Sequence, residues 1–159
     1  MPAPALRLFN VYGPRQLPSD AYAAVIPAFV SRALDGKPLR VTGDGLQTRE
    51  FVCVDTVADV VARAVLDRVC RPTPVNVAFG RSTSLLELVE ALQEVLGKPL
   101  PVMHGPEREG DIRRSRGDGT LLRQLFTAVR SRDLAEGLAD TVGWYRVHLD
   151  GQVSTRSPA

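Results

Sequence analysis

The stretch Gly43-Asp-Gly-Leu-Gln-Thr-Arg-Glu-Phe-Val-Cys-Val-Asp55 decides how the rest of the chain is interpreted. Its Gly-Asp-Gly opening predicts a turn, because glycine adopts positive φ values that other residues resist. The apolar run 51–54 predicts a short buried strand, since β-branched and aromatic side chains suit an enclosed pleated surface. Asp55 is expected to cap the helix that the apolar spacing of residues 57–66 predicts. The stretch is therefore expected to form a turn–strand–helix unit.

A single arginine, Arg49, lies at the corner between this turn and the strand. A guanidinium held there by a rigid strand–helix unit can bind a phosphate group through two parallel hydrogen bonds. The alternative is an ordinary surface arginine that pairs with Glu50 or with a backbone carbonyl oxygen. The spacing of the residues alone leaves both interpretations open.

The rest of the chain alternates apolar runs of strand length with segments of helical spacing. Strands are expected at 5–12, 39–42, 51–54 and 75–79, and helices at 22–34, 57–66, 85–96 and from residue 134 onward. Ser84 and Glu87 stand in capping-box register before the third helix, Gly97 ends it, and Asp133 is expected to cap the last helix.

These elements predict an α/β fold. The mostly apolar run 5–12 is typical of a strand covered on both faces, as in parallel sheets. Residues 1–150 are expected to form the folded portion, and the polar residues 151–159 a disordered tail.

The composition of the chain argues against several classes of function. The chain has 159 residues, of which 44% are apolar, and its 20 basic and 18 acidic residues give a net charge of +2. The basic residues are dispersed, so a nucleic-acid groove is not expected. Cys53 and Cys70 are the only cysteines, and neither a disulfide framework nor a metal site is expected. The first residues lack the pattern of a signal peptide and no apolar run suits a membrane span, so a cytoplasmic protein is expected.

Several segments, in this order, resemble the extended short-chain dehydrogenase/reductase family of NAD-dependent NDP-sugar epimerases and dehydratases, as represented by UDP-glucose 4-epimerase. They are Arg7-Leu-Phe-Asn-Val-Tyr-Gly-Pro-Arg-Gln16, the stretch 43–55, Asn76-Val-Ala-Phe-Gly80 with Ser82-Thr-Ser84, Arg108-Glu-Gly-Asp111, and Leu134-Ala-Glu-Gly-Leu138 with Trp144-Tyr145. The resemblance is to the C-terminal, substrate-binding half. It implies a partial Rossmann-type fold that lacks the N-terminal dinucleotide-binding part and carries a small mixed α/β substrate-binding domain.

The resemblance also implies site residues. Asn10 matches an asparagine that binds the substrate diphosphate, Arg49 and Arg108 match arginines that clamp it, and Asp111 matches a carboxylate beside the nucleotide ribose. Backbone near Val25 and Ile26 is expected to approach the base. Two guanidiniums around a diphosphate neutralise its charge and fix its orientation, and a carboxylate accepts hydrogen bonds from a ribose diol.

Structural alternatives exist for the same residues. Asn10 would satisfy a backbone group at the end of a strand, Arg108 would be a solvated loop charge, and Asp111 would cap the residues that follow it. Tyr12 is expected to pack in the core rather than to act in catalysis.

Two motifs of the family are missing from this sequence. No Gly-x-Gly-x-x-Gly follows a strand, because Thr48 and Leu122 stand where a third glycine would complete the two Gly-Asp-Gly segments. No tyrosine has a lysine four positions later, so the pair that the family uses for proton transfer is absent. We therefore expect no catalytic residue, no bound cofactor and no metal in this chain, although NAD is implied for a complete family enzyme.

The resulting hypothesis is a portion that binds a UDP- or dTDP-sugar and is not catalytic by itself. The alternatives are a non-catalytic interaction module, which docks a Rossmann-type partner or a second copy of itself, and a degenerate truncated epimerase. Strands that normally join a larger sheet would have exposed edges, which favours pairing with a partner or self-association. The sequence does not name the sugar or the base, and it does not separate epimerase from dehydratase or reductase.

Overall fold

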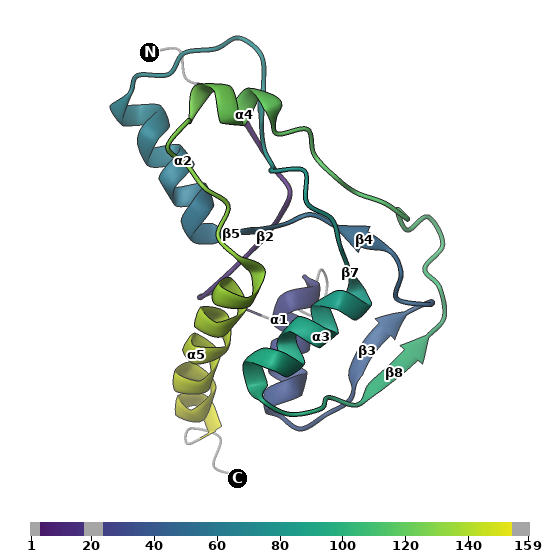
Figure 1. Cartoon of the computed structure of the whole chain (residues 1–159). Helices are drawn as coiled ribbons and strands as arrows, with labels where there is room; N and C mark the ends of the chain where they lie inside the picture. Colours follow the sequence, from purple (N-terminus) through teal and green to yellow (C-terminus); the bar gives the residue numbers. More distant parts are fainter. Residues whose placement is uncertain (1–3, 18–23, 154–159) are drawn as a thin grey trace.

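The computed structural model describes residues 4–17 and 24–153, and its elements pack around two apolar cores (Figure 1). The large core lies among α1 (Val25–Leu34), β3 (Leu39–Thr42), α3 (Leu85–Leu96) and α5 (Leu134–Val153). The small core lies among β1 (Leu6–Leu8), β6 (Val75–Val77), α2 (Val54–Leu66) and α4 (Thr120–Leu125). The fold is mixed α/β, as predicted.

The large core is the better enclosed of the two. Helix α3 lies beside α5 (Figure 1), and the apolar faces of both helices point into this core. Tyr12, which was predicted to be a core residue, is buried there. Its largest buried members include Ile26, Leu39, Leu88, Leu92, Leu138 and Tyr145.

The run 5–12 forms two strands, where the sequence predicted one. Strand β1 pairs in parallel with β6, whereas β2 (Asn10–Tyr12) pairs in parallel with β5 (Phe51–Cys53). The Val11 amide donates to the Phe9 carbonyl oxygen at 2.9 Å, a tight turn that bends the chain between the two strands. The prediction that this run is covered on both faces is wrong for β1, whose residues Arg7 and Leu8 are exposed.

Two further pairs of strands surround the Gly-Asp-Gly turn. Strand β3 pairs in parallel with β8 (Val102–Gly105), and β4 (Thr48–Arg49) pairs antiparallel with β7 (Thr83–Ser84). Both sides of Gly43-Asp-Gly45 are therefore fixed by hydrogen-bonded strands, and β4 leads directly into β5.

The predicted helix ends are mostly confirmed. The Ser84 and Glu87 side chains form the reciprocal capping box of α3, and Gly97 ends α3 with a φ of 66°. Asp133 Oδ1 accepts the Ala135 amide at 2.9 Å at the start of α5. The prediction for Asp55 is wrong, because α2 begins at Val54 with Cys53 as its N-cap residue.

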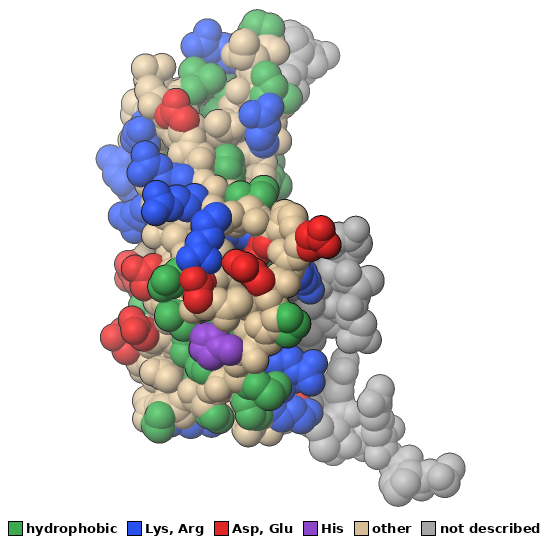
Figure 2. All heavy atoms as spheres, turned by 90° about the vertical axis from the view of Figure 1, so that its right-hand side faces the viewer, with side chains coloured by type: hydrophobic (Ala, Val, Ile, Leu, Met, Phe, Trp, Pro, Cys, Tyr) green, Lys and Arg blue, Asp and Glu red, His purple; other side chains and the backbone are tan. Residues whose placement is uncertain are grey.

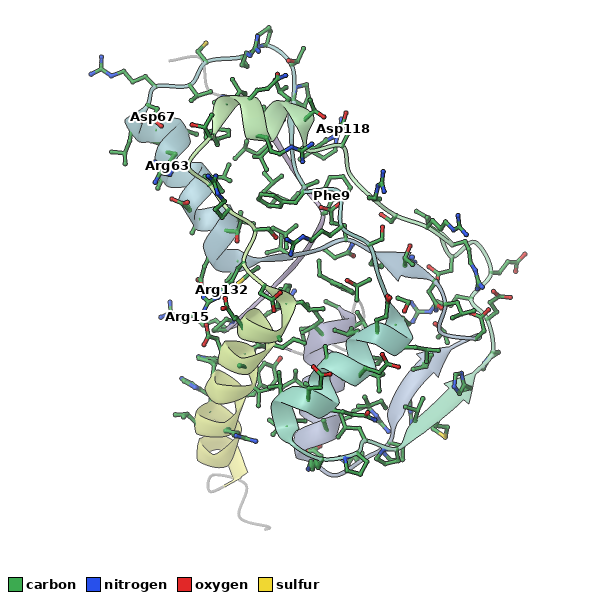
Figure 3. The ribbon with its side chains drawn as sticks, viewed as in Figure 1. Phe9, Arg15, Arg63, Asp67, Asp118 and Arg132 are labelled. Atoms are coloured by element: carbon green, nitrogen blue, oxygen red, sulfur yellow. The ribbon has the colours of Figure 1, made fainter. Side chains whose placement is uncertain are left out.

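Asp55 instead connects the start of α2 to α5. The Arg132 guanidinium, at the start of α5 (Figure 3), contacts Asp55 Oδ2 at 2.5 Å and also pairs with Asp140. Helix α5 continues to Val153, three residues beyond the predicted end of the folded portion, and residues 154–159 of the predicted tail lie outside the described residues. Likewise, residues 22 and 23 of the predicted helix 22–34 lie outside them.

Candidate functional site

A cavity with a volume of about 680 Å³ opens among the described residues, and this volume is within the usual range for a small-molecule site. It lies beside α1, β3 and the strand that carries Arg49. Its lining comprises Asn10, Ala24, Val25, Ala28, Phe29, Ser31, Arg32, Arg40, Thr42, Gln47, Arg49, Leu85, Arg108 and Asp111. We call it the arginine pocket, because four guanidiniums and only one carboxylate line it.

Five of the six predicted site residues meet in this pocket. They are Asn10, Val25, Arg49, Arg108 and Asp111, which come from β2, α1, β4 and the loop after β8. Ile26 does not line it: its side chain is 2% exposed and packs in the large core. Successive residues of a helix point in different directions, so Val25 and Ile26 face the pocket and the core respectively.

Arg49 is held between β7 and the loop after β8. Its Nη1 donates to the Thr48 carbonyl oxygen at 2.9 Å and also to the Ile112 carbonyl oxygen, while its Nη2 forms an ion pair with Asp111. A backbone carbonyl partner was one of the alternatives that the sequence left open, whereas the alternative partner Glu50 forms no ion pair with this guanidinium among the described residues. The guanidinium is thus oriented at the pocket wall, with a carboxylate as its anionic partner.

Asn10 and Arg108 differ in how firmly they are held. Asn10 Nδ2 donates to the Glu50 carbonyl oxygen at 3.2 Å, which ties this side chain to the neighbouring strand. Arg108 is exposed and also lines a second, smaller cavity beside β3 and β8. Its carbonyl oxygen accepts the Asp111 amide at 3.1 Å, so a turn brings Arg108 and Asp111 to the same rim.

The loop that carries these two residues is fastened to the Gly-Asp-Gly turn. Arg113 donates to both oxygens of Asp44, at 2.8 and 2.6 Å, and these hydrogen bonds lower the pKa of Asp44 to about 2. Figure 2 shows the side of the molecule on which β8 and this loop lie, where basic side chains gather beside acidic ones. Paired charges of this kind position the loop next to the pocket.

Glu50, which immediately follows Arg49, is a structural residue that sequence reasoning missed. It is 1% exposed, and its carboxylate accepts the amides of Phe79 at 2.5 Å, Gly80 at 3.0 Å and Gly117 at 2.7 Å. A carboxylate next to an apolar strand was the available signal, since a buried charge needs fixed donors. Glu50 fixes the strand that carries Arg49 against the end of β6 and the loop before α4.

The glycines of the two Gly-Asp-Gly segments are used for packing. A Cβ at Gly45 would lie 2.8 Å from a Leu86 side-chain carbon, and one at Gly119 would lie 1.9 Å from the Ala78 carbonyl oxygen. Neither segment joins a strand to a helix in the way that cradles a dinucleotide pyrophosphate. The described residues therefore form no glycine-rich dinucleotide turn at these two segments. They contain no cluster of three or more potential metal ligands, and no helix among them is both long and apolar enough to span a bilayer.

Comparison with known proteins gives the family. The model of the NAD dependent epimerase/dehydratase family matches residues 1–78. UDP-glucose 4-epimerase of Mycolicibacterium smegmatis is 39% identical over 137 residues, which are 86% of this chain and 43% of that protein. The chain belongs to the NAD-dependent epimerase/dehydratase family.

Solved structures agree with this assignment. UDP-N-acetylglucosamine 4-epimerase from Methanobrevibacter ruminantium, in complex with UDP-N-acetylmuramic acid, has a TM-score of 0.83 and 36% identity over 90% of this chain and 46% of that chain. UDP-glucose 4-epimerase from Thermus thermophilus, in complex with NAD, has a TM-score of 0.76 and 32% identity over 90% of this chain and 46% of that chain. The chain thus has part of the Rossmann-like epimerase fold and spans less than half the length of these relatives.

Proposed function

We propose that the arginine pocket binds the nucleoside diphosphate of an NDP-sugar, and that this chain is the substrate-binding portion of an epimerase or dehydratase. The observation that carries the proposal is that Asn10, Arg49, Arg108 and Asp111, which are distant in sequence, line one cavity. The related epimerase solved with UDP-N-acetylmuramic acid supports this ligand class.

The chemistry of the pocket suits this ligand. A diphosphate brings negative charge, and the Arg49 and Arg108 guanidiniums offer planar, charged donors that match phosphate oxygens. Asn10 adds an amide, while Asp111 supplies oxygens that accept hydrogen bonds from ribose hydroxyls. Asp111 is the anionic partner of Arg49, so phosphate binding replaces one anionic partner of Arg49 by another.

We further propose that the chain does not catalyse the sugar chemistry by itself. NAD supplies the hydride acceptor in the family, and the sequence has neither the glycine-rich motif nor the tyrosine–lysine pair for that step. The part assigned to this chain is to hold and orient the substrate by its diphosphate, which reduces the entropic cost of reaction when a cofactor-bearing partner is present.

Isothermal titration calorimetry with UDP-glucose and dTDP-glucose tests the proposal. Charge-assisted hydrogen bonds contribute about 1.5–3 kcal/mol, so Arg49→Ala is expected to weaken binding by about 10- to 100-fold. Arg63→Ala is the matched control, because Arg63 lies on α2, pairs with Asp59 and does not line the pocket. Absence of saturable binding to the unmodified chain, or equal affinities of the two variants, would exclude this function.

A second candidate function, the docking of a partner, is favoured by the exposed apolar surface around the small core. Among the described strands, β1 pairs only with β6, and its Leu8 is 50% exposed. Helix α2 also exposes Val61, Val65 and Leu66. An unpaired strand edge and an apolar helix face together suit a Rossmann-type domain or a second copy of the chain.

Size-exclusion chromatography with light scattering distinguishes this candidate. We expect association that depends on concentration and that Leu8→Lys weakens, because a lysine opposes strand pairing at a sheet edge. Val147→Lys is a control at an exposed apolar residue of α5, outside both surfaces. A monomer at all concentrations would count against self-association and leave only the partner domain to be tested, by titration with a separately expressed Rossmann domain of a relative.

A further inference from the structure

The buried carboxylate of Glu50 holds the far end of the loop that follows β8. Its Oε2 accepts the Gly117 amide at 2.7 Å, while its Oε1 accepts the amides of Phe79 and Gly80 at the end of β6. The side chain is 1% exposed and forms no ion pair among the described residues, so backbone amides stabilise its charge. A buried charge needs fixed donors, and any movement of the loop away from Glu50 is therefore costly.

The ion pair between Arg113 and Asp44, which fastens the same loop to the Gly-Asp-Gly turn, is exposed by comparison. The two side chains are 50% and 47% exposed, whereas the hydrogen bond between Gly117 and Glu50 is buried. Water and salt weaken an exposed ion pair, but they do not compete for a buried hydrogen bond to a carboxylate. We therefore expect Glu50 to hold the loop more firmly than the ion pair at the rim does.

The segment that ends at Glu50 also contacts the strand that carries Asn10. The Glu50 carbonyl oxygen accepts both the backbone amide and Nδ2 of Asn10, each at 3.2 Å. Two residues earlier, the Thr48 amide donates to the Arg113 carbonyl oxygen at 3.0 Å, and the Thr48 carbonyl oxygen accepts the Ser115 amide at 3.1 Å. This segment thus brings β2 and the loop after β8 together at the pocket.

The loop approaches Glu50 closely because position 117 is a glycine. A Cβ at Gly117 would lie 2.4 Å from the Cβ of Ala78 and 2.5 Å from a ring carbon of Phe9. A larger residue would push the loop backbone away from these atoms and so away from the Glu50 carboxylate. Glycine at position 117 and glutamate at position 50 are therefore complementary to each other.

We propose that Glu50 is a positioning residue of the arginine pocket, and that its hydrogen bond to Gly117 sets the loop where Arg108 and Asp111 line the same cavity as Arg49. The inference rests on the proposed function and adds to it a residue that does not itself line the pocket. The ligand and this hydrogen bond stabilise the same position of the loop. Each therefore strengthens the other, because coupling between two sites is reciprocal.

A double-mutant cycle, measured by calorimetry with UDP-glucose, tests this role. Glu50→Gln has one carbonyl oxygen, which is expected to face the two amides at the end of β6, so its NH₂ group faces the Gly117 amide and that hydrogen bond is lost. We expect Glu50→Gln to weaken the binding of UDP-glucose about tenfold.

The second substitution of the cycle is Arg108→Ala. We expect it to weaken binding about tenfold in the unmodified chain but less than about twofold in Glu50→Gln, because the loop then no longer presents Arg108 to the ligand. A residue that only stabilises the fold would leave the effect of Arg108→Ala unchanged.

The chain offers a chemically matched control in Asp133. Its carboxylate also accepts a backbone amide, that of Ala135, but it lies at the start of α5 and does not line the pocket. Asp133→Asn makes the same change of a carboxylate into an amide, and it is expected to preserve both the affinity for UDP-glucose and the effect of Arg108→Ala. Circular dichroism verifies that each variant folds.

Amide exchange in the unmodified chain, followed by NMR, tests the role without any substitution. Saturation with UDP-glucose is expected to slow the exchange of the Gly117 amide at least about fivefold more than that of the Ala135 amide, because the ligand holds the loop against Glu50. The Ala135 amide is the reference, since it also donates to a carboxylate but lies outside the pocket. This measurement decides the question if Glu50→Gln does not fold.

Three outcomes overturn the positioning role. They are an unchanged affinity for UDP-glucose in folded Glu50→Gln, an effect of Arg108→Ala that is the same with and without Glu50→Gln, and equal slowing of exchange at the Gly117 and Ala135 amides. In each of these cases UDP-glucose still binds the unmodified chain, so the proposed function stands. If UDP-glucose does not bind the unmodified chain, the proposed function fails and this inference fails with it.

Discussion

The two cores differ in how completely they bury the helix that packs on them, as a comparison of α3 with α2 shows. Both have an apolar face with helical spacing, and α3 buries Leu85, Leu88, Val89 and Leu92 in the large core. Helix α2 buries only Thr56 and Val60 and leaves Val61, Val65 and Leu66 exposed. The periodicity of a sequence predicts that a helix forms, but it does not say whether the surface that covers the helix belongs to the same chain.

The arginine pocket lies against the better enclosed core. Phe29 and Leu85 belong to both, so the apolar side of the pocket is continuous with the large core. The exposed β1 edge and α2 face belong to the small core. The comparison predicts that ligand binding and partner docking use different parts of the molecule.

The largest effects are expected from one buried leucine in each core. Leu88 and Leu122 are each 1% exposed, so truncation to alanine is expected to lower the free energy of unfolding by about 2–5 kcal/mol in either case. If the cores unfold together, urea denaturation followed by fluorescence and by far-UV circular dichroism gives one transition that both variants shift.

Two separate transitions, each shifted by only one of the variants, would show that the cores are independent folding units. Leu66→Ala is the control, because Leu66 is 78% exposed and its truncation is expected to change stability by less than about 0.5 kcal/mol.

Glu50 is expected to give the next largest effect, because three backbone amides donate to its buried carboxylate. It extends from the strand beside the pocket to the amides of Gly80 and Gly117. Glu50→Ala leaves buried amides without an acceptor and is expected to lower the free energy of unfolding by about 2–3 kcal/mol. Glu90→Ala, at an exposed position of α3, is the control. A loss no larger than that of the control would show that water replaces the carboxylate without cost.

The sequence predicted local features where a few adjacent residues determine the structure. The capping box of Ser84 and Glu87, the glycine end of α3 and the Asp133 cap are of this kind, and each is confirmed. The two-strand division at Phe9 and the β4–β7 pair were missed, because pairing partners distant in sequence decide both.

The candidate site was likewise predicted in part and missed where contacts between distant segments decide the structure. The family motifs identified side chains that line one cavity, yet the motifs did not separate Val25 from its buried neighbour Ile26. They also missed Gln47 and Glu50. Both are polar residues that are buried because segments distant in sequence pack over them. A local sequence pattern does not predict such burial.

Alkaline pH is expected to destabilise the large core, to which both described tyrosines belong. The buried Tyr145 hydroxyl donates to the Gln16 carbonyl oxygen, and burial raises the pKa of Tyr145 to about 12. The unfolded chain loses this proton near pH 10 while the folded chain keeps it, so stability is complete below pH 10 and falls as the pH rises toward 12.

Tyr145→Phe measures this contribution. The variant loses one hydrogen bond, so it is expected to be about 1 kcal/mol less stable at pH 7. Its stability is also expected to fall less steeply than that of the unmodified chain between pH 10 and 12, as measured by urea denaturation at each pH. Parallel curves for the two proteins would show that Tyr145 is not the group responsible.

The smallest effect is expected at the pocket rim, where Asp44 and Arg113 pair in solvent. Hydrogen bonds from Arg113 lower the pKa of Asp44 to about 2 from an ordinary value of 3.8, so the contribution of the pair is complete above pH 4 and is lost as the pH falls toward 2. Exposed ion pairs contribute little, and Asp44→Asn is expected to raise amide exchange only slightly, and only in residues 106–116. Because the unmodified chain has lost about half of this charge at pH 2, the difference in exchange between the two proteins is expected to be about half as large at pH 2 as at pH 5. An equally large difference at pH 2 and pH 5 would mean that the side chain fastens the loop by its shape and its hydrogen bond to the Leu46 amide, and not by its charge.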